Sequence, residues 1–226
     1  MALSIGSLPL DASPDIGALY AKGRERIVSI LGSCGPVELA TAVPACPGWT
    51  VHDVVSHLVG VVEDAIAGRL SGPPDEALTA EQVERHLADP VDDLVANWSR
   101  LSPFFEAALT ERAIWPALMD VLSHEQDIRG ALDRPGARDE AALLLGARRL
   151  AMIEGLPVTI AITDDPEAQN APSGALVVRT TAFEVLRFRL GRRTCAQVLA
   201  LDWSSDPTAV IDQLFIFGPA QRPIVE

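Results

Sequence analysis

Apolar residues recur at helical spacing in four segments of the first 136 residues, and this periodicity constrains the fold more than any other feature of the chain. Each segment is followed by residues that stop helices, among them Gly32 and the run Ser71-Gly72-Pro73-Pro74. Amphipathic helices of this length bury their apolar stripes against one another. The sequence therefore predicts a four-helix bundle, with helices over residues 11–33, 51–70, 90–109 and 116–132.

The pattern changes after residue 136. Residues 140–154 and 182–190 again have helical spacing, whereas 158–163 and 175–179 are rich in β-branched residues and typical of strands. Gly191 is expected to close the helix before it in a left-handed conformation. The fold class expected is mainly α with an α+β C-terminal part, in two domains over residues 1–136 and 137–226.

Composition and charge limit the cellular setting and the partners. The 226 residues are 48% hydrophobic, which is enough for a buried core, and the three widely spaced cysteines suggest a reducing cytoplasm. Residues 1–10 lack the regions of a signal peptide, and no stretch of about 20 apolar residues could cross a bilayer, so no membrane partner is expected. A net charge of −13 opposes binding to nucleic acid. The sequence leaves the oligomeric state open.

Two short segments carry residues suited to metal binding. Asp120 and His124 are four residues apart, so they lie on one side of a helix. His57 lies in an apolar helical stretch, where an imidazole needs a partner. Two nitrogens and one carboxylate form a three-ligand set that leaves one coordination position open, as in catalytic zinc sites. Zinc is the first choice for these donors, and nickel, manganese or iron are alternatives.

Two acidic residues are candidate partners of these histidines. Thr50 is the predicted N-cap of the second helix, and Asp53 completes a near capping box. Asp53 also precedes His57 by four residues, so it is a candidate to hydrogen-bond that imidazole. Asp127 follows His124 by three residues and is a candidate either to orient it or to form an ion pair with Arg129 or a neighbouring helix.

The remaining candidates have simpler interpretations. His52 lies roughly 140° around the helix from His57, so it is expected at the surface. His86 lies in the charged stretch 81–89 and is also expected at the surface. Trp49 is expected to pack at the helix entry, and the Asp120–His124 pair could stabilise its helix without any metal.

Residues 46–58 and 120–129 resemble the mycothiol-dependent maleylpyruvate isomerase family, within the DinB-like metal-binding bundles. In that family a Pro-Gly-Trp-Thr-Val stretch, here Pro47 to Val51, leads into the first histidine, and an acid-x-x-x-His pair supplies the other ligands. The best-known members have Glu where this chain has Asp120, which is one methylene shorter. The resemblance extends through residues 190–194 and 217–219.

This resemblance implies a DinB-like four-helix bundle over residues 1–136, a small sterol-carrier-like domain over 137–226, and metal ligation by His57, Asp120 and His124. It also implies a metal-dependent enzyme that uses mycothiol, a low-molecular-weight thiol, as the nucleophile for isomerisation of, or transfer to, a small electrophilic substrate. Arg192 or Arg193 is then expected to bind an anionic group of the substrate or cofactor.

Two other functions remain open from the residues alone. A hydrolase would use the same ligands with a metal-bound water, and a non-catalytic regulator would bind metal or ligand without turnover. The spacing of residues identifies no general base beyond the metal ligands, so it does not separate these functions from the first.

Overall fold

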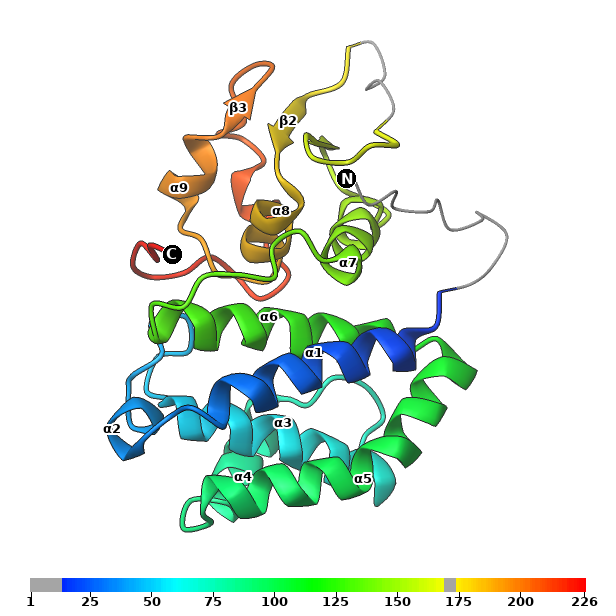
Figure 1. Cartoon of the computed structure of the whole chain (residues 1–226). Coiled ribbons are helices and arrows are strands. Elements are labelled where there is room, and N and C mark those ends of the chain that lie inside the picture. The colour runs from blue at the N-terminus through cyan, green and yellow to red at the C-terminus, as the bar shows by residue number, and fades with distance from the viewer. Residues whose placement is uncertain (1–13, 169–173) are drawn as a thin grey trace, which may run out of the picture.

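The bundle is built by the helices that contribute long apolar stripes. The computed structural model describes residues 14–168 and 174–226, and in it α1 (Ile16–Leu31), α3 (Val51–Ile66), α5 (Val91–Arg112) and α6 (Trp115–Ala131) pack together. α1 and α3 each contact both α5 and α6. The short helices α2 (Pro36–Leu39) and α4 (Glu76–Arg85) lie in the connections around α3, as Figure 1 shows.

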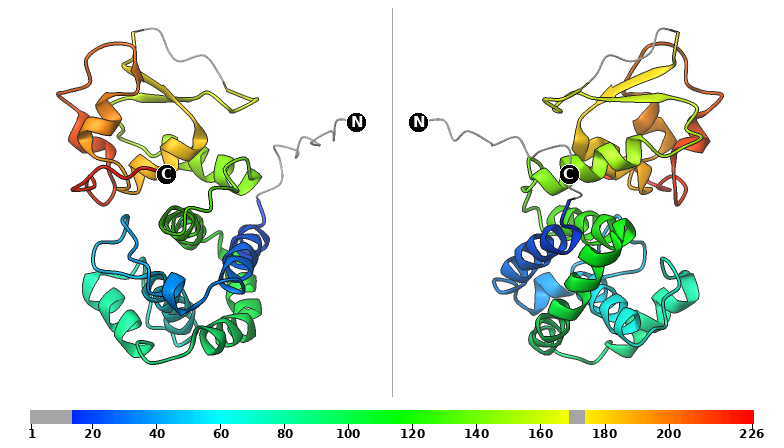
Figure 2. Two further views of the ribbon diagram at one scale, coloured as in Figure 1. Left: turned by 60° about the vertical axis from the view of Figure 1, so that its left-hand side comes forward. Right: turned by 90° about the vertical axis from the view of Figure 1, so that its right-hand side faces the viewer.

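The C-terminal part combines α7 (Ala141–Ala151) and α8 (Ala182–Arg189) with a small sheet. Within the described residues this sheet has the order β1 (Thr159–Ile162), β2 (Val177–Thr180) and β3 (Asp202–Trp203), with β2 parallel to β1 and antiparallel to β3. α9 (Cys195–Leu199) and the 3₁₀ turn η1 (Ile211–Leu214) complete this part. Because α7 and α8 both contact α6, this part lies against the α6 side of the bundle (Figures 1 and 2).

The first turn of α3 is fixed by its predicted cap. The backbone N–H of Asp53 donates to Thr50 Oγ1 at 3.3 Å, and Asp53 Oδ2 accepts from the backbone N–H of Thr50 at 2.8 Å. Both sides of the capping box are thus made, as predicted. The α3 that follows is buried along most of its length, so this cap sets the position of His57 two turns later.

A glycine lets α1 and α5 approach closely. A Cβ atom added at Gly17 would lie 2.1 Å from the backbone oxygen of Glu106, which is inside any allowed contact. Further along the same interface, Trp98 Nε1 donates to the hydroxyl of Tyr20 at 3.1 Å, and both side chains are buried. The polar atoms of these two aromatic residues are therefore satisfied inside the core.

The predicted fold class is confirmed: the chain is mainly helical, with a small sheet confined to its C-terminal part. Gly191 has φ +83°, as predicted for a helix C-terminus, and α5 continues through Pro103. Five short elements were not predicted from the sequence: α2, α4, α9, β3 and η1. Residues 1–10, for which no signal peptide is expected, and the predicted helix start at 11–13 lie outside the described residues. Within residues 14–168 and 174–226, the helices are too short or too polar to span a bilayer.

The prediction for His86 is wrong. It was expected at the surface, yet only 5% of it is exposed. Its imidazole lies between Glu63 Oε2, at 3.0 Å from Nε2, and Asp89 Oδ2, at 2.8 Å from Nδ1. The physical reason is that α4 packs against α3, and His86 at the C-cap of α4 is covered as a result.

Candidate metal centre

α3 and α6 bring His57, Asp120 and His124 to one place. The distance from His57 Nε2 to Asp120 Oδ2 is 3.6 Å, and from His124 Nε2 to Asp120 Oδ1 it is 3.5 Å. One donor atom from each of the three residues lies within 4.8 Å of the other two. Ligand atoms bound tetrahedrally at zinc–ligand distances of about 2.0–2.1 Å are themselves about 3.4 Å apart. The separations in this site therefore suit a cation of that size.

Hydrogen bonds on the far side of each ring determine which nitrogens are free. His57 Nδ1 lies 2.9 Å from Gln82 Oε1, and His124 Nδ1 lies 3.0 Å from Asp127 Oδ2. Since these oxygens accept hydrogen bonds, each Nδ1 carries a hydrogen. Each Nε2 faces Asp120 and offers a lone pair there when its ring is neutral. Two lone pairs and a carboxylate that face one point form a donor set that fits a divalent metal.

The charges in the site are strongly coupled. Burial opposes ionisation of Asp120, but the charge of His57 and the hydrogen bond and charge of His124 outweigh it, and the pKa of Asp120 lies far below its ordinary value. Burial also opposes protonation of His124, yet Asp120 and Asp127 raise the pKa of His124 well above its ordinary value. Without metal, His124 therefore tends to hold a proton that a metal would displace.

The site opens to solvent beside Asp120. The side chain of Asp120 is 30% exposed, against 4% for His57 and 7% for His124. Trp49, at the entry to α3, lies against both rings, with its centroid 5.3 Å from that of His57 and 6.3 Å from that of His124. Asp120 is thus the most solvent-exposed of the three candidate ligands, while the imidazoles are covered.

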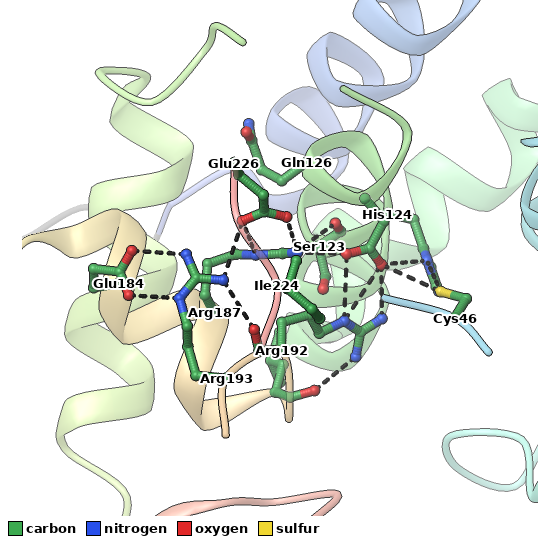
Figure 3. A network of polar contacts seen from close by, with 12 residues as sticks. Cys46, Ser123, His124, Gln126, Glu184, Arg187, Arg192, Arg193, Ile224 and Glu226 are labelled. Carbon is green, nitrogen blue, oxygen red and sulfur yellow. Dashed lines mark hydrogen bonds and ion pairs between the residues drawn. The ribbon is translucent and has the colours of Figure 1, made fainter. Parts of the chain in front are cut away.

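Asp127 connects His124 to the C-terminal part of the chain. Figure 3 shows His124, Arg187 and Arg192 within this network of polar contacts. Its Oδ1 accepts from Arg187 Nη1 at 2.6 Å, and its Oδ2 accepts from Arg192 Nη2 at 2.9 Å. Arg187 and Asp127 are both fully buried, and Arg187 also pairs with Glu226. Burial opposes ionisation of Asp127, but Arg192, Arg187 and His124 hold its pKa well below the ordinary value. Asp127 is therefore a permanent negative charge behind His124.

Two expected site residues take other partners. Asp53 was a candidate partner for His57, but its carboxylate accepts from Thr50, because the capping box binds it at the start of α3. Arg193 was expected to bind an anionic group, but its side chain is 7% exposed and pairs with Glu184 and Glu226. Arg192 remains beside the site through its pair with Asp127 and is 14% exposed.

Two residues of the site were missed from the sequence. Cys46 Sγ lies 3.5 Å from Asp127 Oδ2 and 3.9 Å from His124 Nδ1. Cys46, His124 and Asp127 also have donor atoms within 4.8 Å of one another, but arginines already occupy both oxygens of Asp127. The set with Asp120 is thus the better cation site. The second missed residue is Gln82, and nothing in the sequence pointed to it because α4 was not predicted. Cys46 could have been found, because it begins the segment that carries the family resemblance.

Comparisons with known proteins assign a family to part of the chain and a fold to most of it. Residues 20–129, which include all three candidate ligands, match the sequence profile of the mycothiol maleylpyruvate isomerase N-terminal domain. No curated protein shows significant sequence similarity to the chain. A solved structure described as the mycothiol-dependent maleylpyruvate isomerase has the same fold, with a TM-score of 0.51 and 15% identity over 88% of this chain and 94% of that one. Residues 20–129 therefore belong to the mycothiol maleylpyruvate isomerase N-terminal domain family.

Proposed function

We propose that this protein is a metal-dependent enzyme that uses mycothiol to isomerise a small electrophilic substrate or to transfer the thiol to it. The observation that carries the proposal is the convergence of His57, Asp120 and His124, with the Nε2 atoms of both rings facing the carboxylate. The family of residues 20–129 and the description of the structurally similar isomerase support the thiol and the type of reaction.

The charge of the proposed ligand set favours an anionic ligand at the open position. Asp120 contributes one negative charge and the two imidazoles are neutral when they bind metal, so a divalent cation would keep a net positive charge. A bound divalent metal, with zinc as the first choice, would lower the pKa of a thiol beside it and hold that thiol as a nucleophilic thiolate.

The residues around the ligands have separate tasks in this proposal. Asp127 orients His124, and Trp49 covers the two imidazoles from the loop before α3. Arg192 is our candidate for an anionic group of substrate or thiol, because it lies beside the site and is 14% exposed. We assign metal binding to the domain of residues 1–136 and closure of the site to the domain of residues 137–226. We place the protein in the reducing cytoplasm.

Metal analysis and calorimetry test the proposal. Purified protein is expected to contain about one equivalent of divalent metal and to bind mycothiol more tightly than glutathione, while His57→Ala is expected to lose both metal and thiol binding. With maleylpyruvate, isomerisation at the double bond is expected only when mycothiol is present. Turnover without thiol would instead indicate a hydrolase, and metal binding without turnover would indicate a regulator.

A further inference from the structure

We infer that Gln82 is a positioning residue that fixes the tautomer of His57, and that Asp64 controls this tautomer through Gln82. The inference rests on the proposed function, because the tautomer of His57 decides whether its Nε2 can bind a metal. Neither Gln82 nor Asp64 touches the candidate ligand position itself, so their influence is transmitted by hydrogen bonds.

Three buried groups form a chain of hydrogen bonds behind the metal centre. Gln82 Oε1 lies 2.9 Å from His57 Nδ1, and Gln82 Nε2 lies 2.7 Å from Asp64 Oδ2. Gln82 and Asp64 have no exposed surface. Asp64 Oδ1 in turn accepts from Arg69 Nε at 2.7 Å and lies 3.0 Å from Arg85 Nη2.

The direction of each hydrogen bond follows from the chemistry of the ends. A guanidinium can only donate and a carboxylate can only accept, so Asp64 must accept from both arginines and from Gln82. The amide nitrogen of Gln82 therefore faces Asp64, and its oxygen faces His57. His57 must donate from Nδ1, which in the neutral ring leaves a lone pair on Nε2, the atom 3.6 Å from Asp120.

Helix spacing explains why these groups meet. His57, Gly60 and Asp64 are separated by three and four residues, so they lie along one face of α3, and α4 packs on that face. A Cβ atom added at Gly60 would lie 2.6 Å from Cβ of Gln82. The glycine thus allows α4 to come close enough for Gln82 to reach His57 and Asp64 together.

The two imidazoles are held by different kinds of partner. His124 donates to the carboxylate of Asp127, whose charge is balanced by Arg187 and Arg192. His57 donates to a neutral amide that can rotate by 180° and then offer a donor in place of an acceptor. The tautomer of His57 therefore depends on which way the amide of Gln82 is turned, whereas the partner of His124 can only accept.

Asp64→Asn tests this dependence without changing the shape of the side chain. The arginines still require an oxygen at their side of residue 64, so the new amide nitrogen would face Gln82. Gln82 is then expected to rotate, to present its own NH₂ to His57 Nδ1, and to place the hydrogen of His57 on Nε2. We expect a loss of zinc affinity of at least about 10-fold, typical for outer partners of metal ligands.

The tautomer is read directly by ¹⁵N NMR of the ring nitrogens in the chelator-treated protein, at a pH where the ring is neutral. Four histidines in the whole chain make the assignment practical. The natural protein is expected to have hydrogen on Nδ1 of His57, and Asp64→Asn to have it on Nε2. If Asp64 had a purely structural role, Asp64→Asn would change the stability of the protein but not the tautomer of His57.

Gln82→Leu provides a second test if Asp64→Asn does not fold. It removes the acceptor for Nδ1, so a mixture of tautomers and a zinc affinity about 10–100-fold lower are expected. Gln126→Leu is the matched control, because Gln126 is also buried but donates to the backbone oxygen of Gly136. It is expected to leave zinc affinity unchanged within about twofold.

The outcomes separate this inference from the proposed function. If the natural protein binds no metal, the proposed function fails, and the NMR measurement still decides the inference. If the natural protein binds zinc but neither the tautomer nor the affinity changes in Asp64→Asn and Gln82→Leu, the inference is overturned and the proposed function stands.

Discussion

At the scale of single residues, His124 is held by contacts on both sides of its ring. Its Nε2 lies 3.5 Å from Asp120, its Nδ1 lies 3.0 Å from Asp127, and its ring stacks beside Trp49. Both ring nitrogens therefore have fixed partners, and rotation of the ring would break both contacts.

Replacement of His124 removes one of the three proposed ligands. We expect His124→Ala to lose stoichiometric metal, because the two remaining donors, one of them a partly exposed carboxylate, are fewer than the three protein ligands of a catalytic zinc site. Metal analysis of the purified variant measures this. The control is His52→Ala, which removes an imidazole that is bound to the backbone oxygen of Asp89. A full equivalent of metal in His124→Ala would refute the ligand assignment.

Metal affinity is expected to rise with pH. Burial lowers the pKa of His124, but Asp120 and Asp127 outweigh it and raise the pKa well above the ordinary value of about 6.5. A metal binds only the neutral ring, so below this raised pKa it must displace a proton, and affinity falls about tenfold per pH unit. Above the raised pKa the affinity levels off.

Calorimetry in buffers with different ionisation enthalpies measures the released proton. In Asp127→Asn one of the two carboxylates that raise the pKa is lost, so the affinity should level off at a lower pH. Affinity that stays constant between about pH 6 and 8 would contradict this account.

Helical spacing together with the family motifs brought forward His57, Asp120, His124 and Asp127. It could not place Arg193, since the pairing of Arg193 with Glu226 depends on how the end of the chain folds back. The roles of the metal ligands themselves remain predictions until metal is measured.

At the scale of elements, α4 shows the limit of periodicity. Gln82 is the buried residue of this 10-residue helix, so α4 has no apolar stripe to detect. Its position is instead fixed by polar contacts, such as Arg85 with Glu63 at 2.9 Å and Gln82 with Asp64. α1, α3, α5 and α6 were predicted because each buries several large apolar side chains.

Because α1 and α5 are in close contact at Gly17, adding one methyl group there is expected to lower the stability strongly. Gly17→Ala would place Cβ 2.1 Å from the backbone oxygen of Glu106, so the helices must separate. We expect the free energy of unfolding to fall by about 1–3 kcal/mol, as for other overpacked cores. Denaturant unfolding measures it, with Gly72→Ala as the control, because a Cβ at Gly72 meets no atom within 4 Å. Equal stabilities of the two variants would contradict the close packing of α1 on α5.

At the scale of the whole molecule, buried ion pairs join the C-terminal part to the bundle. Arg187 of α8 reaches Asp127 of α6 at 2.6 Å, and Arg187 Nε lies 3.0 Å from Glu226 Oε2. These pairs cross between the two domains predicted from the sequence. Sequence patterns could not show them, because they depend on contacts between segments about 60 residues apart.

Loss of this connection is expected to destabilise the whole chain. Arg187→Met leaves Asp127 and Glu226 buried without their shared partner, which costs roughly 3–5 kcal/mol of unfolding free energy. The control is Arg179→Met, because Arg179 is 49% exposed and its pair with Asp202 spans 3.8 Å, so a change below about 1 kcal/mol is expected. If the two variants unfold at the same denaturant concentration, the buried pairs do not hold the parts together.

The middle of α6 is buried on all sides, and its consecutive polar residues contact different neighbours. His124 faces the candidate metal centre, Glu125 binds Arg26 of α1 at 2.6 Å, and Asp127 binds Arg187 of α8. A slip of α6 by one residue would turn it by about 100° and would leave each of these side chains facing the wrong neighbour. The rotational register of α6 is therefore set by its charges, and transplanting the Asp-x-x-x-His pair into another bundle would require its arginine partners as well.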